Sequence, residues 1–546
     1  MAKSASPALA VRAILALALM IGFFVLAIAI AGALLYIPYA EWTYAHRLHF
    51  KLAFFCVVGA GIILWSMLPR PDRFTPPGPR LEPAQHPRLF AELTGIAKAV
   101  GQPMPADVFL VPEVNAWVSQ RGGIMGFGSR RVMGLGLPLL RMLTTSQLKA
   151  VLAHEFGHYH GGDTKLGPWI YKTRFAIVRT LHGLAGHSSL LQMPFLWYGE
   201  MFLRITHAVS RHQEFAADQL AARTVGSQPL VTGLRTIHGA GLAWSSFLTS
   251  EVAPVVNVGF RPPLAEGFAC FFQAPPVAHA ISSALEQEII DAKTDPYDTH
   301  PPLRDRIAAI QNSPLGAEPA DDPAAISLLE GLPELERQIL ALMSGDRALK
   351  PVSWDKVGEQ VYMPMWESMR LKEIVALSVV TAGSLPEASR QQSEFMRRSH
   401  TSPGVNINHV AATTIGAALA IALIKRGWLL DVSPGAEVSL QLGEESIKPF
   451  AVFPQLVSGE LAADAWRSQC AALGIGDVNL ATGERVARGI GDVSLVAAER
   501  DGGGGIEATS TPQPRWRKDE DTRVSCPHCG HFNPRFAPSC GKCGLR

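Results

Sequence analysis

The sequence predicts a mainly helical α+β protein that begins with a membrane hairpin. The run Ala13–Ile37 carries no charge and exceeds the about 20 residues that a helix needs to cross a bilayer. Farther along, segments with helical spacing of apolar residues are interrupted by only a few short runs typical of strands. Hydrophobic residues make up 48% of the 546 residues and charged residues only 18%, which is apolar for a wholly soluble protein.

A second apolar run, at 52–68, completes the predicted hairpin. It is shorter than the first and lies between Lys51 and Arg70, so a buried core helix is its alternative. The first run is too long for the core of a cleaved signal peptide, although an Ala-Gly-Ala sequence would suit cleavage. We therefore expect residues 1–75 to form an anchor of two transmembrane helices in the lipid bilayer. Basic residues outside the runs outnumber those in the turn, which favours a cytoplasmic location for both ends.

The stretch VLAHEFGHYH at 151–160 predicts a metal site on a helix. Residues 144–147 have the pattern of a capping box, and an apolar stripe follows them. On such a helix His154 and His158 lie one turn apart on one face and can bind the same ion. Glu155 lies beside the first of them, close enough to reach a water on the metal. The alternative is three polar residues on an ordinary helix, because this short pattern also arises by chance.

A second predicted helix, at 205–224, offers the missing ligand. A hydrolytic zinc site usually has three protein ligands and a water, so two histidines are not enough. Glu214 and Asp218 are four residues apart and share one face of this helix. Glu214 can complete the zinc site, while Asp218 can accept a hydrogen bond from the far nitrogen of a ligating histidine. His207 and His212 are alternatives, but packing or surface roles suit them better.

Four motifs resemble those of the M48 family of integral-membrane zinc metalloproteases, which includes the HtpX heat-shock proteases and the CAAX prenyl proteases. They are VNAW at 114–117, HEFGH at 154–158, EFAAD at 214–218 and THPPLRDRI at 299–307, in family order. The resemblance implies a gluzincin-like core at 76–312. It implies that the zinc ligands are His154, His158 and Glu214. It also implies that Glu155 is the general base and that Asp218 is the hydrogen-bond partner of a ligating histidine. We expect a bacterial inner-membrane protein, and the bias of basic residues places its catalytic domain in the cytoplasm.

The chemistry expected of this set is peptide-bond hydrolysis. Zinc lowers the pKa of a bound water to about 7, and Glu155 can take its proton and pass it to the leaving amine. Arg211, His300 and Arg306 are candidate oxyanion donors, with salt bridges and caps as equally good alternatives. The predicted function is a membrane-anchored zinc endopeptidase that acts on proteins or peptides, including membrane proteins in quality control. The alternatives are a noncatalytic membrane scaffold and a prenyl-protein protease, which would need a larger intramembrane chamber.

Two predicted strands precede the catalytic helix, at 107–112 and 130–140. The resemblance suggests that Asn115 and an edge strand within 130–140 hold the substrate backbone, since an extended peptide can add to a sheet edge. The glycines at 122–128 favour a flexible substrate flap over a phosphate-binding loop. The apolar but charge-interrupted region 166–208 predicts long amphipathic helices rather than spans, at the membrane surface, over the active site or in the protease core.

The C-terminal half departs from the HtpX and prenyl-protease pattern. A linker is expected at 313–325, followed by an α/β accessory domain at 326–480 of unknown role. The apolar run at 410–424 is too short for a span and should be a buried helix. A flexible tether is expected at 481–525.

The last residues, 526–546, contain two CxxC pairs typical of a zinc ribbon. Disulfides are the alternative. We thus expect one catalytic and one structural zinc, and a ribbon that recruits proteins rather than nucleic acid, because the net charge is only +2 and the flank has mixed sign. The structural ligands would be Cys526, Cys529, Cys540 and Cys543.

Overall fold

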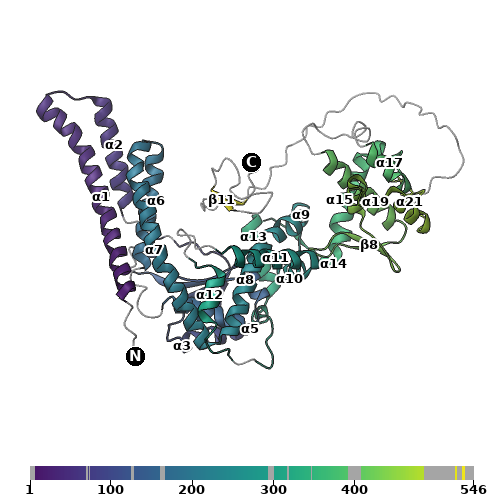
Figure 1. Ribbon diagram of the computed structural model, residues 1–546, viewed down its shortest axis with the longest axis horizontal. Coiled ribbons are helices and arrows are strands. Elements are labelled where there is room, and N and C mark those ends of the chain that lie inside the picture. The colour runs from purple at the N-terminus through teal and green to yellow at the C-terminus, as the bar shows by residue number, and fades with distance from the viewer. Residues whose placement is uncertain are drawn as a thin grey trace. The chain divides into compact units, whose positions relative to one another are not determined.

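The structure is a computed structural model and is mainly helical, as predicted (Figure 1). The chain divides into two compact units, Met1–Ile339 with Leu349–Val486, and Leu340–Ala348 with Ala487–Arg546. The residues that the structure describes are 7–68, 72, 74–123, 128–159, 167–292, 300–316, 319–345, 347–391, 407–484, 523–525 and 532–534.

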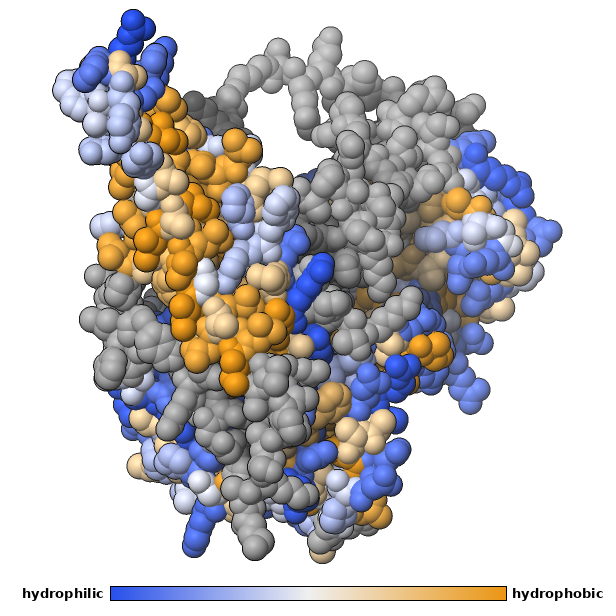
Figure 2. Space-filling model, turned by 60° about the vertical axis from the view of Figure 1, so that its left-hand side comes forward, coloured by the Kyte–Doolittle hydropathy of each residue, from blue (hydrophilic) through white to orange (hydrophobic). Residues whose placement is uncertain are grey.

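The two apolar runs of the predicted hairpin form two antiparallel helices. Helix α1 (Pro7–Ala45) and helix α2 (Phe50–Met67) are both long and apolar enough to cross a membrane. Many of their large apolar side chains are exposed, including Val25 and Phe54. Figure 2 shows the resulting broad hydrophobic face. Such a face is unfavourable in water and is explained by contact with lipid or with another protein.

Two further helices pack against this hairpin. Helix α6 (Gly167–Ala185) contacts α2, and the first half of α7 (Ser189–Thr224) contacts α1. Phe195 and Phe202 of α7 are fully buried in the core that they share with the hairpin. The sequence left open where the amphipathic region 166–208 lies. The structure places its helices against the membrane hairpin, because their apolar side chains match the inner faces of α1 and α2.

A four-stranded sheet lies beside the catalytic helix, and it corrects one prediction. Its strands are β1 (Arg80–Leu81), β2 (Asp107–Val111), β3 (Ala116–Arg121) and β4 (Arg130–Gly136), in the order β1-β2-β4-β3. The predicted edge strand is β4, which pairs with β2 on one side and β3 on the other. Its backbone groups are therefore used within the sheet, and β3 is the edge. After Gly136 the chain turns into helix α4 (Leu137–Met142).

Glycine makes the centre of this sheet possible. A Cβ atom at Gly134 would lie 2.4 Å from the indole ring of Trp117, its partner on β3. The indole therefore occupies the space where another residue would place its side chain.

The remaining elements of the catalytic part are α5 and the elements around it and the sheet. Most are short helices whose apolar faces are buried. Their bounds are α3 (Pro87–Ala99), α5 (Thr145–Gly157), α8 (Ser227–Phe247), π-helix η2 (Leu248–Val252), α9 (Ala253–Asn257), β5 (Phe260–Arg261), α10 (Leu264–Gln273), α11 (Pro275–Asp291) and α12 (Leu303–Ile310).

The segment after the catalytic part has a core of its own around helix α19 (Ile407–Ile424), which is buried as predicted. The other elements are η3 (Ala325–Leu328), α13 (Leu332–Ser344), β6 (Lys350–Pro351), α14 (Trp354–Val357), η4 (Gly358–Tyr362), α15 (Met363–Lys372), α16 (Ile374–Leu377), η5 (Ala382–Ser384), α17 (Leu385–Arg390), β7 (Leu429–Asp431), β8 (Ser439–Leu442), β9 (Glu445–Ile447), α20 (Pro449–Ser458) and α21 (Ala463–Ala472).

The C-terminal unit contains an antiparallel pair, β10 (Arg523–Ser525) with β11 (Phe532–Pro534). The four cysteines of the predicted zinc ribbon, and residues 124–127 of the predicted flap, lie outside the described residues. The ribbon and the flap stay predictions.

Candidate active site

The catalytic helix α5 begins and ends as its sequence dictates. The side chain of Thr144 accepts a hydrogen bond from the Gln147 amide, and Gln147 returns one to Thr144, which completes the predicted capping box. The helix ends at Gly157, where a Cβ atom would lie 3.1 Å from the Cα of Ala217 on α7. Glycine therefore lets the two helices approach closely at the level of the predicted metal site.

That approach brings Glu214 of α7 onto the two histidines of α5. Its Oε2 lies 3.4 Å from His154 Nε2, and its Oε1 lies 3.5 Å from His158 Nε2, so each oxygen faces one imidazole. Ligands of a tetrahedral zinc with bonds near 2.0–2.1 Å are about 3.3–3.4 Å apart. The two distances from the Glu214 carboxylate to the histidines are therefore close to those between ligands of one zinc ion.

The surroundings also fit a cation. Glu214 Oε2 is buried and faces His154 Nε2 and His300 Nδ1 at 3.4 and 3.2 Å. Burial acts to lower the pKa of His154, but hydrogen bonds with Asp218 and Glu214 outweigh it and raise the pKa to about 9. The carboxylates thus favour positive charge at this point, as a zinc site requires.

Asp218 lies behind the first histidine, as the resemblance implied. Its Oδ1 is 2.8 Å from His154 Nδ1, and none of its side chain is exposed. A carboxylate there sets the tautomer and orientation of the ring, so that Nε2 points toward Glu214.

Arg306 of α12 is bound to the same carboxylate. Its Nε and Nη2 donate to Asp218 at 2.8 and 2.7 Å, and the side chain is buried. This arrangement favours the salt-bridge alternative for Arg306 over a role as an oxyanion donor.

His300 is the predicted oxyanion candidate that reaches the site and also contacts solvent. Its Nδ1 lies 3.2 Å from Glu214 Oε2, and 60% of its side chain is exposed. A side chain in this position can reach both the metal-binding carboxylate and an incoming substrate. Arg211 lies one turn before Glu214 on α7 and stays a candidate.

The two alternative histidines of α7 lie away from the site. His212 is exposed, and His207 is buried against Arg174 of α6. Neither position competes with Glu214 for the histidines of α5.

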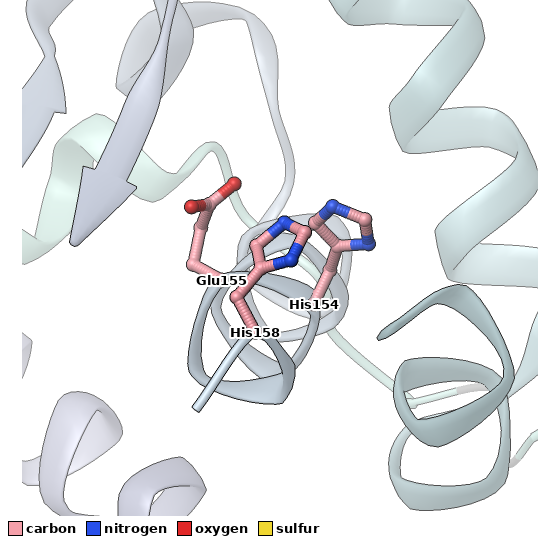
Figure 3. Close-up of side chains that lie close together, drawn as sticks. All are labelled: His154, Glu155 and His158. Atoms are coloured by element: carbon pink, nitrogen blue, oxygen red, sulfur yellow. The ribbon is translucent and has the colours of Figure 1, made fainter. Parts of the chain in front are cut away.

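Glu155 lies beside the two imidazoles. The ligand atoms of Glu155, His154 and His158 are all within 4.8 Å of one another, and Figure 3 shows the carboxylate next to the His158 ring. Burial raises the pKa of Glu155 to about 7, against the effect of the nearby His154. A carboxylate with a pKa near the ambient pH is suited to accept and return a proton.

The substrate side of the site differs from the prediction. Asn115 directly precedes β3, and its carbonyl accepts a hydrogen bond from the Gly136 amide at 2.8 Å. The edge that continues from Asn115 is β3.

Sequence reasoning also missed Tyr159, whose hydroxyl donates to Val118 O of β3 at 2.8 Å. Its position next to His158 was the available signal.

Part of the chain is similar to known proteases. Residues 83–313 match Peptidase family M48. The chain is 28% identical over 167 residues to Protease HtpX of Idiomarina loihiensis, 25% identical over 234 residues to Protease HtpX of Vibrio cholerae, and 24% identical over 243 residues to a Protease HtpX homolog of Janthinobacterium.

These matches cover 28%, 39% and 41% of this chain and 56%, 67% and 71% of the relatives. The chain thus spans little more than half the length of the first of these relatives. No solved structure matches the chain.

The fold, the site and these matches define a domain of the metallopeptidase class. Residues 83–313 are M48-like, since they match Peptidase family M48, and the chain is similar to the HtpX proteases. The resemblance recognised in the four sequence motifs is confirmed.

Proposed function

We propose that this protein is a membrane-anchored, zinc-dependent endopeptidase. The observation that carries the proposal is the convergence of His154, His158 and Glu214 from two helices, with Glu155 alongside. The match of residues 83–313 to Peptidase family M48 supports the same conclusion independently.

Each residue of the site has a distinct task in peptide hydrolysis. A zinc ion held by His154, His158 and Glu214 would supply the Lewis acidity that activates water and polarises the scissile carbonyl. Glu155 accepts the proton of the attacking water and delivers it to the leaving amine. Asp218 keeps the His154 ring in place, and His300 is positioned to donate to the developing oxyanion.

The substrate is proposed to bind as an extended strand along β3. This strand is the edge of the sheet, and α5 contacts it. An edge strand holds a peptide mainly through its backbone, which would permit the cleavage of diverse proteins, including unfolded membrane proteins.

The helices α1, α2, α6 and the first half of α7 are proposed to anchor this site at a bacterial inner membrane, with the catalytic part in the cytoplasm. Large apolar side chains are exposed on α7 as well as on α1, such as Trp197 at 67% and Val25 at 61%. Because α7 continues from this bundle to Glu214, the anchor and the metal site share one continuous helix.

The C-terminal cysteines are proposed to hold a second, structural zinc that shapes a protein-recruiting ribbon. Cys526, Cys529, Cys540 and Cys543 supply four thiolates, which leave no coordination position for water.

The central experiment compares the wild type with Glu155→Gln in detergent. Metal analysis should find the same zinc content in both proteins, because Glu155 is not a proposed ligand. The appearance of new peptide ends in an added unfolded protein should require the wild type. Equal cleavage by both proteins would refute the mechanism, and absence of zinc from the wild type would refute the site.

A further inference from the structure

The open edge of β3 has an alternating pattern of backbone groups. In an antiparallel pair, every second residue exchanges hydrogen bonds with its partner strand, and the others point away. Because the Asn115 carbonyl is bonded to Gly136, the residues at odd positions face β4. The amide and carbonyl groups of Ala116, Val118 and Gln120 therefore point outward, where a substrate strand would pair.

One of these outward groups is already bonded. Tyr159, the residue after His158, donates its hydroxyl to the Val118 carbonyl at 2.8 Å. One contact holds the ring of Tyr159 and another holds its backbone. The guanidinium of Arg131 lies 4.2 Å from the ring centroid, and Gln102 Nε2 donates to the Tyr159 carbonyl at 3.1 Å. This is a packed arrangement that fixes the ring against the sheet edge.

The far end of the same edge is held by another contact. Arg121 is paired with Asp72 at 2.9 Å, and the Gly122 amide donates to the same carboxylate at 2.8 Å. The Val118 carbonyl and the Gly122 amide are therefore already bonded within the chain. The stretch of open edge before Val118 is short and is centred on Ala116.

We propose that Tyr159 is a positioning residue that limits strand pairing: by occupying the Val118 carbonyl, it restricts a bound peptide to the backbone groups around Ala116. This inference rests on the proposed endopeptidase function. It assigns the enzyme a preference for substrates with a short extended segment, such as an exposed loop or an unfolded end, over those that could add a long strand.

The test measures one substrate hydrogen bond at a time. A peptide that the wild type cleaves is synthesised with each amide in turn replaced by an ester, which removes one N–H donor with little change in shape. The values of kcat and KM are then measured for the wild type and for Tyr159→Phe.

In the wild type, the ester facing Val118 should leave kcat/KM unchanged, because Tyr159 supplies the donor. In Tyr159→Phe the same ester should lower kcat/KM roughly 2- to 10-fold, as expected for one lost hydrogen bond. The effect should lie in KM rather than kcat. The penalty of the ester facing Ala116 should be the same in both proteins.

Tyr198→Phe is the matched control. Tyr198 also donates its hydroxyl to a backbone carbonyl, that of Leu19, but it lies in the helical bundle away from the sheet. Its ester profile should equal that of the wild type. Arg131→Met, which loosens the ring without removing the hydroxyl, should give an intermediate profile and serves as a second variant if Tyr159→Phe folds poorly.

A wrong role for Tyr159 can be told apart from a wrong proposed function. If no ester position responds differently in Tyr159→Phe and the wild type, the inference is wrong while the endopeptidase assignment stands. If the wild type cleaves no peptide, or if Glu155→Gln cleaves equally well, the proposed function itself is overturned.

Discussion

Replacing Asp218 by Asn separates the two tasks that the structure gives to this carboxylate. Asp218 accepts two hydrogen bonds from the buried Arg306 and one from His154 Nδ1, all at 2.7–2.8 Å. Asparagine keeps the shape and one acceptor oxygen but removes the charge. Two losses are therefore expected, one in stability and one in zinc affinity.

The stability loss should be the larger of the two. Removing one partner of a buried ion pair costs about 3–5 kcal/mol because the other charge is left uncompensated. With one acceptor retained, about 3 kcal/mol is expected, which lowers Tm by roughly 6–12 °C. Loss of the carboxylate behind a ligating histidine typically weakens metal binding by about 10- to 100-fold, or about 1.4–2.7 kcal/mol.

A second substitution separates the two effects. In Asp218→Asn with Arg306→Gln, no buried charge is left unpaired, so most of the stability should return. Zinc affinity, measured by competition with a chromogenic chelator, should stay low because the His154 ring still lacks its carboxylate. Arg306→Gln alone is the control and should lose stability while binding zinc within about 3-fold of the wild type. Full recovery of zinc affinity in the double variant would refute the direct role of Asp218 at His154.

Three further predictions concern helix α5 and its contacts. Glu155→Gln should lower kcat by at least about 100-fold with unchanged zinc content, as measured by peptide cleavage and metal analysis; full activity would exclude Glu155 as the base. Gly157→Val should destabilise the protein by about 1–3 kcal/mol in thermal unfolding, because a side chain there meets Ala217; an unchanged Tm would show that the helices can separate. Asp322 accepts a hydrogen bond from the Ser146 amide at the start of α5. Partial burial acts to raise the pKa of Asp322, but its hydrogen bonds with Ser146 outweigh burial and lower the pKa. Because the pKa of Asp322 is lowered in the folded protein, its carboxylate should stabilise the fold by roughly 0.5–1 kcal/mol above about pH 4, and this stabilisation should be lost as the pH falls further. An Asp322→Asn variant whose Tm has the same acid sensitivity as that of the wild type would contradict this prediction.

Much of the catalytic helix could be predicted because its determinants are local. The capping box at Thr144 and the four-residue spacing of His154 and His158 depend only on helix geometry, and the structure has both. The hairpin of α1 and α2 was predictable for the same reason, since length and apolarity are properties of a single segment.

Predictions that depended on neighbours succeeded less well. Strand β4 has the composition of an edge strand as readily as of a central one, because alternation says nothing about which strands flank it. Strand β3, the actual edge, was not recognised as a strand. The amphipathic region 166–208, which forms α6 and the first half of α7, gave no sign of its partner, because an amphipathic face predicts burial but does not identify the surface that buries it.

The sequence by itself determined which residues can bind a metal and where a helix presents two of them on one face, because those relations span four residues. Only the tertiary structure decided that Glu214 meets these histidines, that Arg306 is committed to Asp218 and that Tyr159 occupies the sheet edge. These contacts join segments far apart in the chain, and their geometry depends on how closely α5, α7 and the sheet can pack.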